Sequence, residues 1–111
     1  MTAVAVLQEA LARGGRVEWS PPDKPRLLAP PSLHAAIKAD RETVKEILRR
    51  AAIFREQATR FLREGRGFPI LAIPEHEGLE GCHSCGSPLH GRRYRCDLCA
   101  LAVALALEGM P

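Results

Sequence analysis

The sequence predicts a small α+β protein. It has an αββαα N-terminal module with a long helix, and a small C-terminal module built on four cysteines and ending in an apolar helix. Two Cys-x2-Cys pairs lie near the end of the 111 residues, a long amphipathic pattern precedes them, and two short segments of alternating polarity come before that pattern. We therefore divide the chain into a first module at residues 1–66, an extended linker at 67–80 and the four-cysteine module at 81–111.

The first helix is predicted over residues 3–13. Val4, Leu7 and Leu11 recur there at helical spacing, so one face of this helix is apolar. Gly14 follows, and glycine readily adopts the left-handed backbone that ends many helices.

Two short strands follow the first helix. Residues 16–19 alternate polar and apolar side chains, as a half-buried strand does. Residues 21–25 are rich in proline and contain an aspartate, which favours a turn, and residues 26–29 return as the second strand. The resulting hairpin is too small to be stable alone and needs a helix beneath it.

A short helix and a long helix complete the N-terminal module. Ser32 can cap the short helix at residues 33–39, and Asp40 can cap the long helix that Gly65 ends. The long helix is amphipathic, because its apolar residues recur on one face and its charged residues occupy the others. The apolar face is formed by Val44, Ile47, Leu48, Ala51, Phe54, Ala58, Phe61 and Leu62.

A segment bracketed by prolines connects the two modules. Residues 68–73 are apolar, so we expect an extended segment lying on another surface, or an edge strand. Residues 74–81 are polar, and we place the boundary between the modules there.

The four cysteines predict one structural zinc ion. Their pattern is Cys82-x2-Cys85, ten residues, then Cys96-x2-Cys99, and four thiolates can close a tetrahedral shell around Zn²⁺. Such a site contributes on the order of 10 kcal/mol or more to folding, which a segment this short needs. A filled shell leaves no open position for catalysis, and no acid–base pair or phosphate loop is visible, so we expect no enzymatic activity.

Other interpretations of the cysteines stay open. Residues 100–108 are rich in alanine and leucine, which favours a helix and a treble-clef finger, whereas the alternation of larger apolar residues would suit a zinc ribbon. Four cysteines can also hold an iron–sulfur cluster. Cys82, Cys85, His90 and Cys96 nearly match a retroviral-type zinc knuckle, missing by one residue before the last cysteine.

The apolar C-terminal helix must be buried, because it carries apolar residues nearly all round. The four-cysteine module is too small to cover it. We expect it to pack on the long helix and on residues 68–73, or against a second copy of the protein as a homodimer.

The formal net charge of +3 is too mild to identify a nucleic-acid-binding protein. A basic loop between the cysteine pairs, together with basic residues of the long helix, offers phosphate contacts and one base-stacking aromatic ring. The alternative is a solvated hairpin tip that offsets the negative charge of zinc held by four thiolates. The candidate contacts are Arg92, Arg93, Tyr94, Arg95, Arg49 and Arg50.

The sequence also indicates the cellular compartment of the protein. The N-terminus lacks the basic start and apolar run of a secretory signal, and the longest apolar run, residues 100–107, is too short to cross a membrane. We expect a cytoplasmic protein, in which reduced cysteines bind metal instead of forming disulfides. The excess of arginine over lysine, with much alanine, leucine and proline, suggests a GC-rich bacterial genome.

The order of helix, two short strands, short helix and long helix over residues 3–64 resembles the TubC-type N-terminal docking domain, found on hybrid polyketide and peptide synthetases. The residues that carry the resemblance are Leu7, Leu11, Gly15, Val17, Trp19, Leu27, Leu33, Ile37, Val44, Ile47 and Leu48. It implies an αββαα fold, often dimeric, that captures a short linear peptide through its hairpin by β-augmentation. Similar small domains look to be present on replication proteins of phages and plasmids.

We therefore expect a zinc-binding module for protein–protein docking, an accessory protein of a bacterial mobile element. Val17, Trp19 and Leu27 would line its peptide-docking surface. The alternative is an accessory or regulatory protein that binds DNA or RNA through the basic loop and the long helix.

Overall fold

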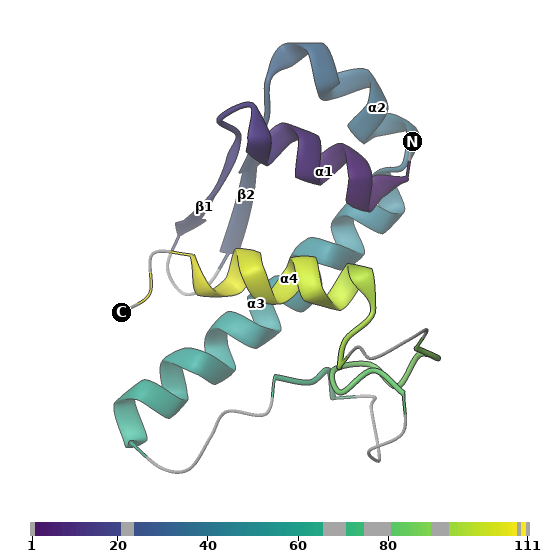
Figure 1. Ribbon diagram of the computed structural model, residues 1–111. Coiled ribbons are helices and arrows are strands. Elements are labelled where there is room, and N and C mark those ends of the chain that lie inside the picture. Colours follow the sequence, from purple (N-terminus) through teal and green to yellow (C-terminus); the bar gives the residue numbers. More distant parts are fainter. Residues whose placement is uncertain are drawn as a thin grey trace.

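The computed structural model describes residues 2–20, 24–65, 71–74, 81–89, 94–108 and 110. Over these residues the α+β class is confirmed, with four α-helices and one two-stranded antiparallel sheet (Figure 1). The elements are α1 (Ala3–Ala12), β1 (Arg16–Ser20), β2 (Lys24–Leu28), the 3₁₀ turn η1 (Pro31–Leu33), α2 (His34–Ala39), α3 (Arg41–Glu64) and α4 (Asp97–Leu107). None of the described helices is both long and apolar enough to cross a membrane.

Helix α1 has a capped start and a tightly packed end. The Thr2 hydroxyl oxygen accepts a hydrogen bond from the backbone N–H of Ala5 at 3.1 Å, which satisfies one of the free donors of the first turn. Gly14 has a φ of 88° and turns the chain out of the helix. At Gly15 a Cβ atom would lie 2.6 Å from the carbonyl oxygen of Ala10, so the turn into β1 has room only for glycine.

Strands β1 and β2 form a hairpin with one face toward the core. Val17 lies opposite Leu27 and Trp19 lies opposite Pro25. Val17 is buried, and Trp19 and Leu27 pack against the core cluster. The predicted turn at residues 21–25 includes residues 21–23, which lie outside the described residues.

Helix α3 contributes one apolar face to the core. Its buried residues are Val44, Ile47, Ala51, Phe54 and Ala58. The helix ends at Gly65, whose φ of 63° is left-handed and whose N–H donates to the carbonyl oxygen of Phe61. The predicted apolar face was too long at this end, because Leu62 is 49% exposed where α3 runs past the packed elements.

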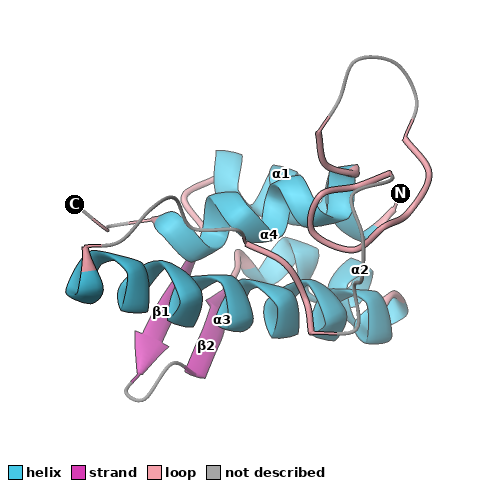
Figure 2. Cartoon of the chain, turned by 90° about the horizontal axis from the view of Figure 1, so that it is seen from below, coloured by secondary structure: helices cyan, strands magenta, loops and turns pink. Residues whose placement is uncertain are grey.

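Helix α4 packs against α3. Leu101, Ala102, Leu105 and Ala106 of α4 belong to the same buried cluster as Phe54 of α3. In Figure 2, α4 lies between α1 and α3. One hydrophobic cluster therefore contains residues of both predicted modules.

Arg55 of α3 connects three elements. Its Nη1 donates hydrogen bonds to the carbonyl oxygens of Ala106 at 2.9 Å and Glu108 at 3.1 Å, at the C-terminal end of α4. Helix α4 has no basic residue in its own last turn, so this guanidinium supplies the charge that a helix C-terminus favours. The Cζ atom of Arg55 also lies 4.7 Å from the ring centre of Trp19 in β1.

Residues 71–74 form an extended segment beside α3. Leu71 and Ile73 are buried in the core cluster. Between them, the side-chain amide of Gln57 donates to the Ala72 carbonyl oxygen at 2.7 Å, and its oxygen accepts from the Ala72 N–H at 3.1 Å. This pair of bonds satisfies a backbone that has no strand beside it among the described residues. Residues 68–70 of the predicted extended segment, and 75–80 of the predicted linker, lie outside the described residues.

Candidate metal centre

The four cysteines lie together in a group that could hold one metal ion. The Sγ atoms of Cys82, Cys85, Cys96 and Cys99 all lie within 4.8 Å of one another, and none is in a disulfide. The Sγ atoms of Cys85 and Cys96 are 3.7 Å apart. Zinc–sulfur bonds of about 2.3 Å in a tetrahedron place neighbouring sulfurs about 3.8 Å apart, so this donor set fits zinc.

The first cysteine pair is held in a tight turn. The Cys82 N–H donates to the Ser87 carbonyl oxygen and the Gly86 N–H donates to the Cys82 carbonyl oxygen, each at 2.8 Å. Gly86 has a φ of 80° and Gly81 a φ of 70°, both in the left-handed region that glycine favours. A Cβ atom on Gly81 would lie 2.5 Å from the Ser87 carbonyl oxygen, so the turn closes only with glycine there.

The second cysteine pair opens α4. Cys96 occupies the N-cap position, and the N–H of Ala100 donates to its carbonyl oxygen at 2.8 Å. Cys99 follows in the first turn and is buried. The N–H of His83 donates to the carbonyl oxygen of Tyr94 at 2.8 Å, which connects the turn of the first pair to the segment before the second.

An arginine of the N-terminal module contacts the group. The Nη1 of Arg50 donates to Cys99 Sγ at 3.2 Å, and its Nε donates to Glu46 Oε1 at 2.8 Å. The side chain of Arg50 is only 17% exposed. Arg49 forms a second ion pair with Glu46, and hydrogen bonding from Arg49, aided by Arg50 and opposed by burial, lowers the pKa of Glu46 to about 2. Glu46 therefore stays anionic and holds Arg50 against the Cys99 Sγ atom.

The thiols differ in environment. Burial raises the pKa of Cys99 above its ordinary value, against the hydrogen bond from Arg50, and burial raises that of Cys96 as well. At Cys85 burial also acts to raise the pKa, but hydrogen bonds with Ser87 outweigh it and the pKa falls to about 6. A bound cation favours all four thiolates, because metal ligation requires the deprotonated form.

Ser84 anchors the first pair to the core, and sequence reasoning missed it. Its side chain is fully buried, donates to the Leu71 carbonyl oxygen at 2.5 Å, and accepts from Arg95 Nε at 2.9 Å. Its own carbonyl oxygen accepts from the Ile73 N–H at 2.9 Å. The sequence indicates this role only through the position of Ser84 between two predicted metal ligands. A polar side chain that is buried there needs hydrogen-bond partners.

The predicted nucleic-acid contacts have several different roles in the structure. Arg50 and Arg95 direct hydrogen bonds inward, to Cys99 and Ser84, and Arg49 pairs with Glu46. Tyr94 is 72% exposed and its ring lies 5.4 Å from that of His83. Arg92 and Arg93 lie outside the described residues, as does His90 of the alternative knuckle.

The three predicted peptide-docking residues also lie in different environments. Val17 is 7% exposed and belongs to the core. Trp19 packs under Arg55, and its buried indole N–H has no acceptor among the described residues. Leu27 lines two adjoining surface clefts.

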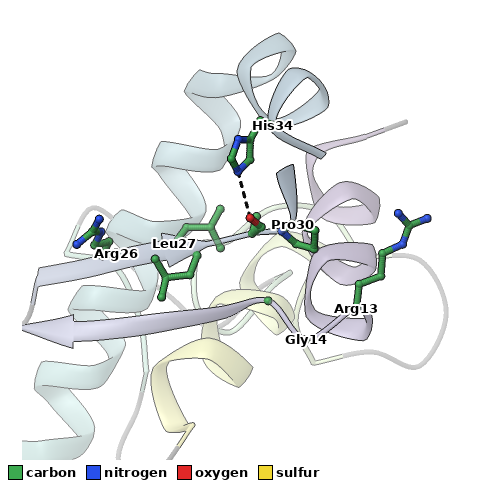
Figure 3. A pocket seen from close by; sticks show the side chains of 9 residues that line it. Arg13, Gly14, Arg26, Leu27, Pro30 and His34 are labelled. Atoms are coloured by element: carbon green, nitrogen blue, oxygen red, sulfur yellow. Dashed lines mark hydrogen bonds between the residues drawn. The ribbon is translucent and has the colours of Figure 1, made fainter. Parts of the chain in front are cut away.

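Two adjoining clefts follow β2. The larger cleft has a volume of about 650 Å³. It is lined by residues 26–28 of β2, by residues 29–30 that follow the strand, and by Arg13 and Gly14 at the end of α1. The smaller, about 260 Å³, lies between β2, α2 and α3 and is lined mainly by apolar side chains, including Ile37 and Leu48. Figure 3 shows Arg26 and Arg13 at opposite ends of the larger cleft, with His34 between them donating to the Ala29 carbonyl oxygen at 3.1 Å.

No family model, curated protein or solved structure matches this chain at a significant level. The resemblance to the TubC-type docking domain is therefore not supported by a related protein.

Proposed function

We propose that the chain is a non-enzymatic interaction module in which one structural zinc ion stabilises the fold and the outer edge of β2 docks a short extended peptide. The single observation that carries the docking function is the pair of adjoining clefts along β2. The zinc supports the fold and takes no part in binding.

The donor set favours zinc as the metal. Cys82, Cys85, Cys96 and Cys99 would hold it through four thiolates, and zinc in such a shell supplies folding free energy and no reaction. Two of the ligands, Cys82 and Cys99, are fully buried within the core cluster. The metal would therefore act as part of the core.

The edge of β2 suits an added strand. Among the described residues β2 pairs only with β1, so its other edge can accept the backbone hydrogen bonds of an extended peptide. Pro25 has no N–H to offer, so pairing would run along the following residues, from Arg26 to Ala29. Those residues line the larger cleft.

The lining of the clefts indicates the chemistry of the peptide. The smaller cleft offers an apolar pocket among Leu27, Ile37 and Leu48 for an alternate side chain of the added strand. Arg13 and Arg26 line the larger cleft, and no carboxylate lines either one. We therefore expect a peptide with an apolar anchor and acidic neighbours.

Fluorescence polarisation against a library of extended peptides tests this proposal. Acidic peptides with an apolar anchor should bind, and Arg26→Glu should weaken them at least severalfold. Arg16→Glu is the matched control, because Arg16 is exposed on β1 and lines neither cleft. The proposal fails if no peptide binds, or if both variants bind equally well.

A parallel titration with single-stranded and duplex DNA and RNA distinguishes peptide docking from the alternative function, which is nucleic-acid binding. Phosphate contacts lose affinity steeply as salt rises, whereas a docked strand depends much less on salt. Tight, salt-sensitive binding to nucleic acid without peptide binding would replace docking with the alternative.

A further inference from the structure

We propose that Leu27 fixes the register and the direction of the peptide that docks at the outer edge of β2. The peptide runs antiparallel to β2, places one large apolar side chain in the smaller cleft, and carries an acidic residue directly after it. This inference rests on the docking function proposed above, and it specifies the backbone atoms and the residue order that the edge recognises.

The carbonyl groups of β2 and its continuation alternate in direction. The Leu28 carbonyl oxygen faces β1, because a Cβ atom on Gly15, just before β1, would lie 2.9 Å from it. The Ala29 carbonyl oxygen faces α2, where it accepts a hydrogen bond from His34 at 3.1 Å (Figure 3). Successive strand residues direct their backbone groups to opposite edges of the strand. The N–H and C=O of Leu27 therefore point to the outer edge.

Leu27 is the position at which this edge offers both a donor and an acceptor. Pro25, two residues earlier, has no N–H, and the carbonyl oxygen of Ala29, two residues later, already has His34 as its donor. A peptide residue that lies opposite Leu27 in an antiparallel pair exchanges both hydrogen bonds with it. We choose the antiparallel direction because parallel pairing is slightly less stable per residue.

The peptide residue opposite Leu27 carries the apolar anchor. Leu27 pairs with Val17, which is buried, so the Leu27 side chain lies on the core side of the hairpin. Paired residues project their side chains to the same face, and on that face lies the smaller cleft of about 260 Å³. Leu27 and Ala29, which alternate onto this face, both line it together with Ile37 and Leu48. The anchor therefore enters the smaller cleft.

Charges on the other face of the hairpin set the order of the peptide residues. The residue after the anchor lies opposite Arg26, and the residue before it lies opposite the apolar Leu28. Among the described residues this face carries Arg16, Lys24 and Arg26 against Glu18 alone, and Glu18 is paired with Arg16 at 3.1 Å. A carboxylate is therefore favoured directly after the anchor.

The remaining basic residues of the clefts do not alter this order. Arg13 lies at the far end of the larger cleft and is already paired with Glu9 at 2.8 Å. Lys38 of α2 lines the smaller cleft, on the face that takes the anchor. The side chains before and after the anchor project to the opposite face.

Two peptides of the same composition test the direction. Labelled Ser-Thr-Leu-Glu-Thr-Ser and Ser-Glu-Leu-Thr-Thr-Ser are titrated against the zinc-loaded full chain by fluorescence polarisation. The first should bind at least about threefold more tightly, and Arg26→Gln should remove the difference. Equal binding, tighter binding of the second, or failure of both while other library peptides bind would overturn the register and leave docking intact. If no peptide of any sequence binds, docking itself fails.

Backbone N-methylation of the first peptide tests the pairing at Leu27. A methyl group on the leucine nitrogen removes the donor to the Leu27 carbonyl oxygen and should weaken binding at least about tenfold. The N–H groups of the threonine before it and the glutamate after it point away from β2, so methylation there should change affinity by less than about threefold. The reverse pattern, or equal losses at all three positions, would overturn the register.

A variant of His34 tests where the pairing ends. The serine two residues before the leucine lies opposite Ala29, so its N-methylation should have little effect on the unmodified protein. In His34→Ala the Ala29 carbonyl oxygen loses its donor, and the same methylation should then weaken binding severalfold. Lys38→Ala, an exposed residue of the same helix, is the matched control and should stay insensitive. Insensitivity of both variants would overturn this end of the register.

Discussion

Arg50 of α3 donates a hydrogen bond to Cys99 Sγ of α4 at 3.2 Å, although the two residues are 49 positions apart. The contact places a cation beside a group of four thiolates that would carry a net negative charge around zinc. It also connects the metal centre to α3, the helix that contributes Phe54 and Ile47 to the core. The metal and the N-terminal module are therefore expected to stabilise each other.

Replacing Arg50 tests this connection. Arg50→Gln should accelerate zinc transfer to a competing chelator and lower the free energy of unfolding by about 1–3 kcal/mol, because a buried thiolate loses a charged donor. The measurement is zinc release followed with a chromogenic chelator, together with denaturant unfolding. Arg49→Gln is the matched control, since Arg49 is more exposed and pairs with the same glutamate. Equal release rates for the two variants would mean that the Arg50 contact does not hold the metal.

Zinc removal should affect the hairpin as well as the cysteine loops. Trp19 is the only tryptophan, and Arg55 packs over it while capping α4. When a chelator releases α4 from α3, the Trp19 emission should shift to longer wavelength together with a loss of helical circular dichroism. If the circular dichroism falls while the Trp19 emission stays constant, the N-terminal module is independent of the metal centre.

Ser84 should matter more than an exposed serine. Ser84→Ala removes the donor to Leu71 and the acceptor of Arg95, and leaves buried polar groups without partners. We expect a loss of about 1–3 kcal/mol in denaturant unfolding of the zinc-loaded protein. Ser20→Ala, at the exposed end of β1, should change stability by less than about 0.5 kcal/mol. Similar losses for both serines would contradict the buried network.

Arg55 should stabilise the end of α4. Arg55→Gln removes hydrogen bonds to two carbonyl oxygens and the contact with Trp19, and should cost about 1–3 kcal/mol. Arg60→Gln breaks only an exposed pair with Glu56 and should cost less than about 1 kcal/mol. Thermal unfolding of both variants gives the comparison, and equal midpoints would show that the capping contact contributes nothing.

Local patterns predicted much of this fold. The apolar spacing of α3 and the glycine at residue 65 placed a long helix that the structure contains at Arg41–Glu64. The spacing of the cysteines predicted the group of four that the structure brings together. Both rest on short-range chemistry, namely helical periodicity and the tight turn of a Cys-x2-Cys pair.

Contacts between distant side chains could not be predicted in the same way. Nothing near Arg50 in the sequence distinguishes it from Arg49, yet one faces Cys99 and the other is more exposed. Likewise Leu62 continues the apolar spacing of α3 but lies beyond the elements that pack on it. Such differences depend on where α4 crosses α3, which only the tertiary packing decides.

The most direct test of the central claim is the metal content of the purified protein. Native mass spectrometry with elemental analysis should show one zinc ion per chain, lost together with folded structure on chelation. Far less than one zinc per chain, an iron–sulfur chromophore, or a fold unchanged by the chelator would contradict a structural zinc held by the four cysteines.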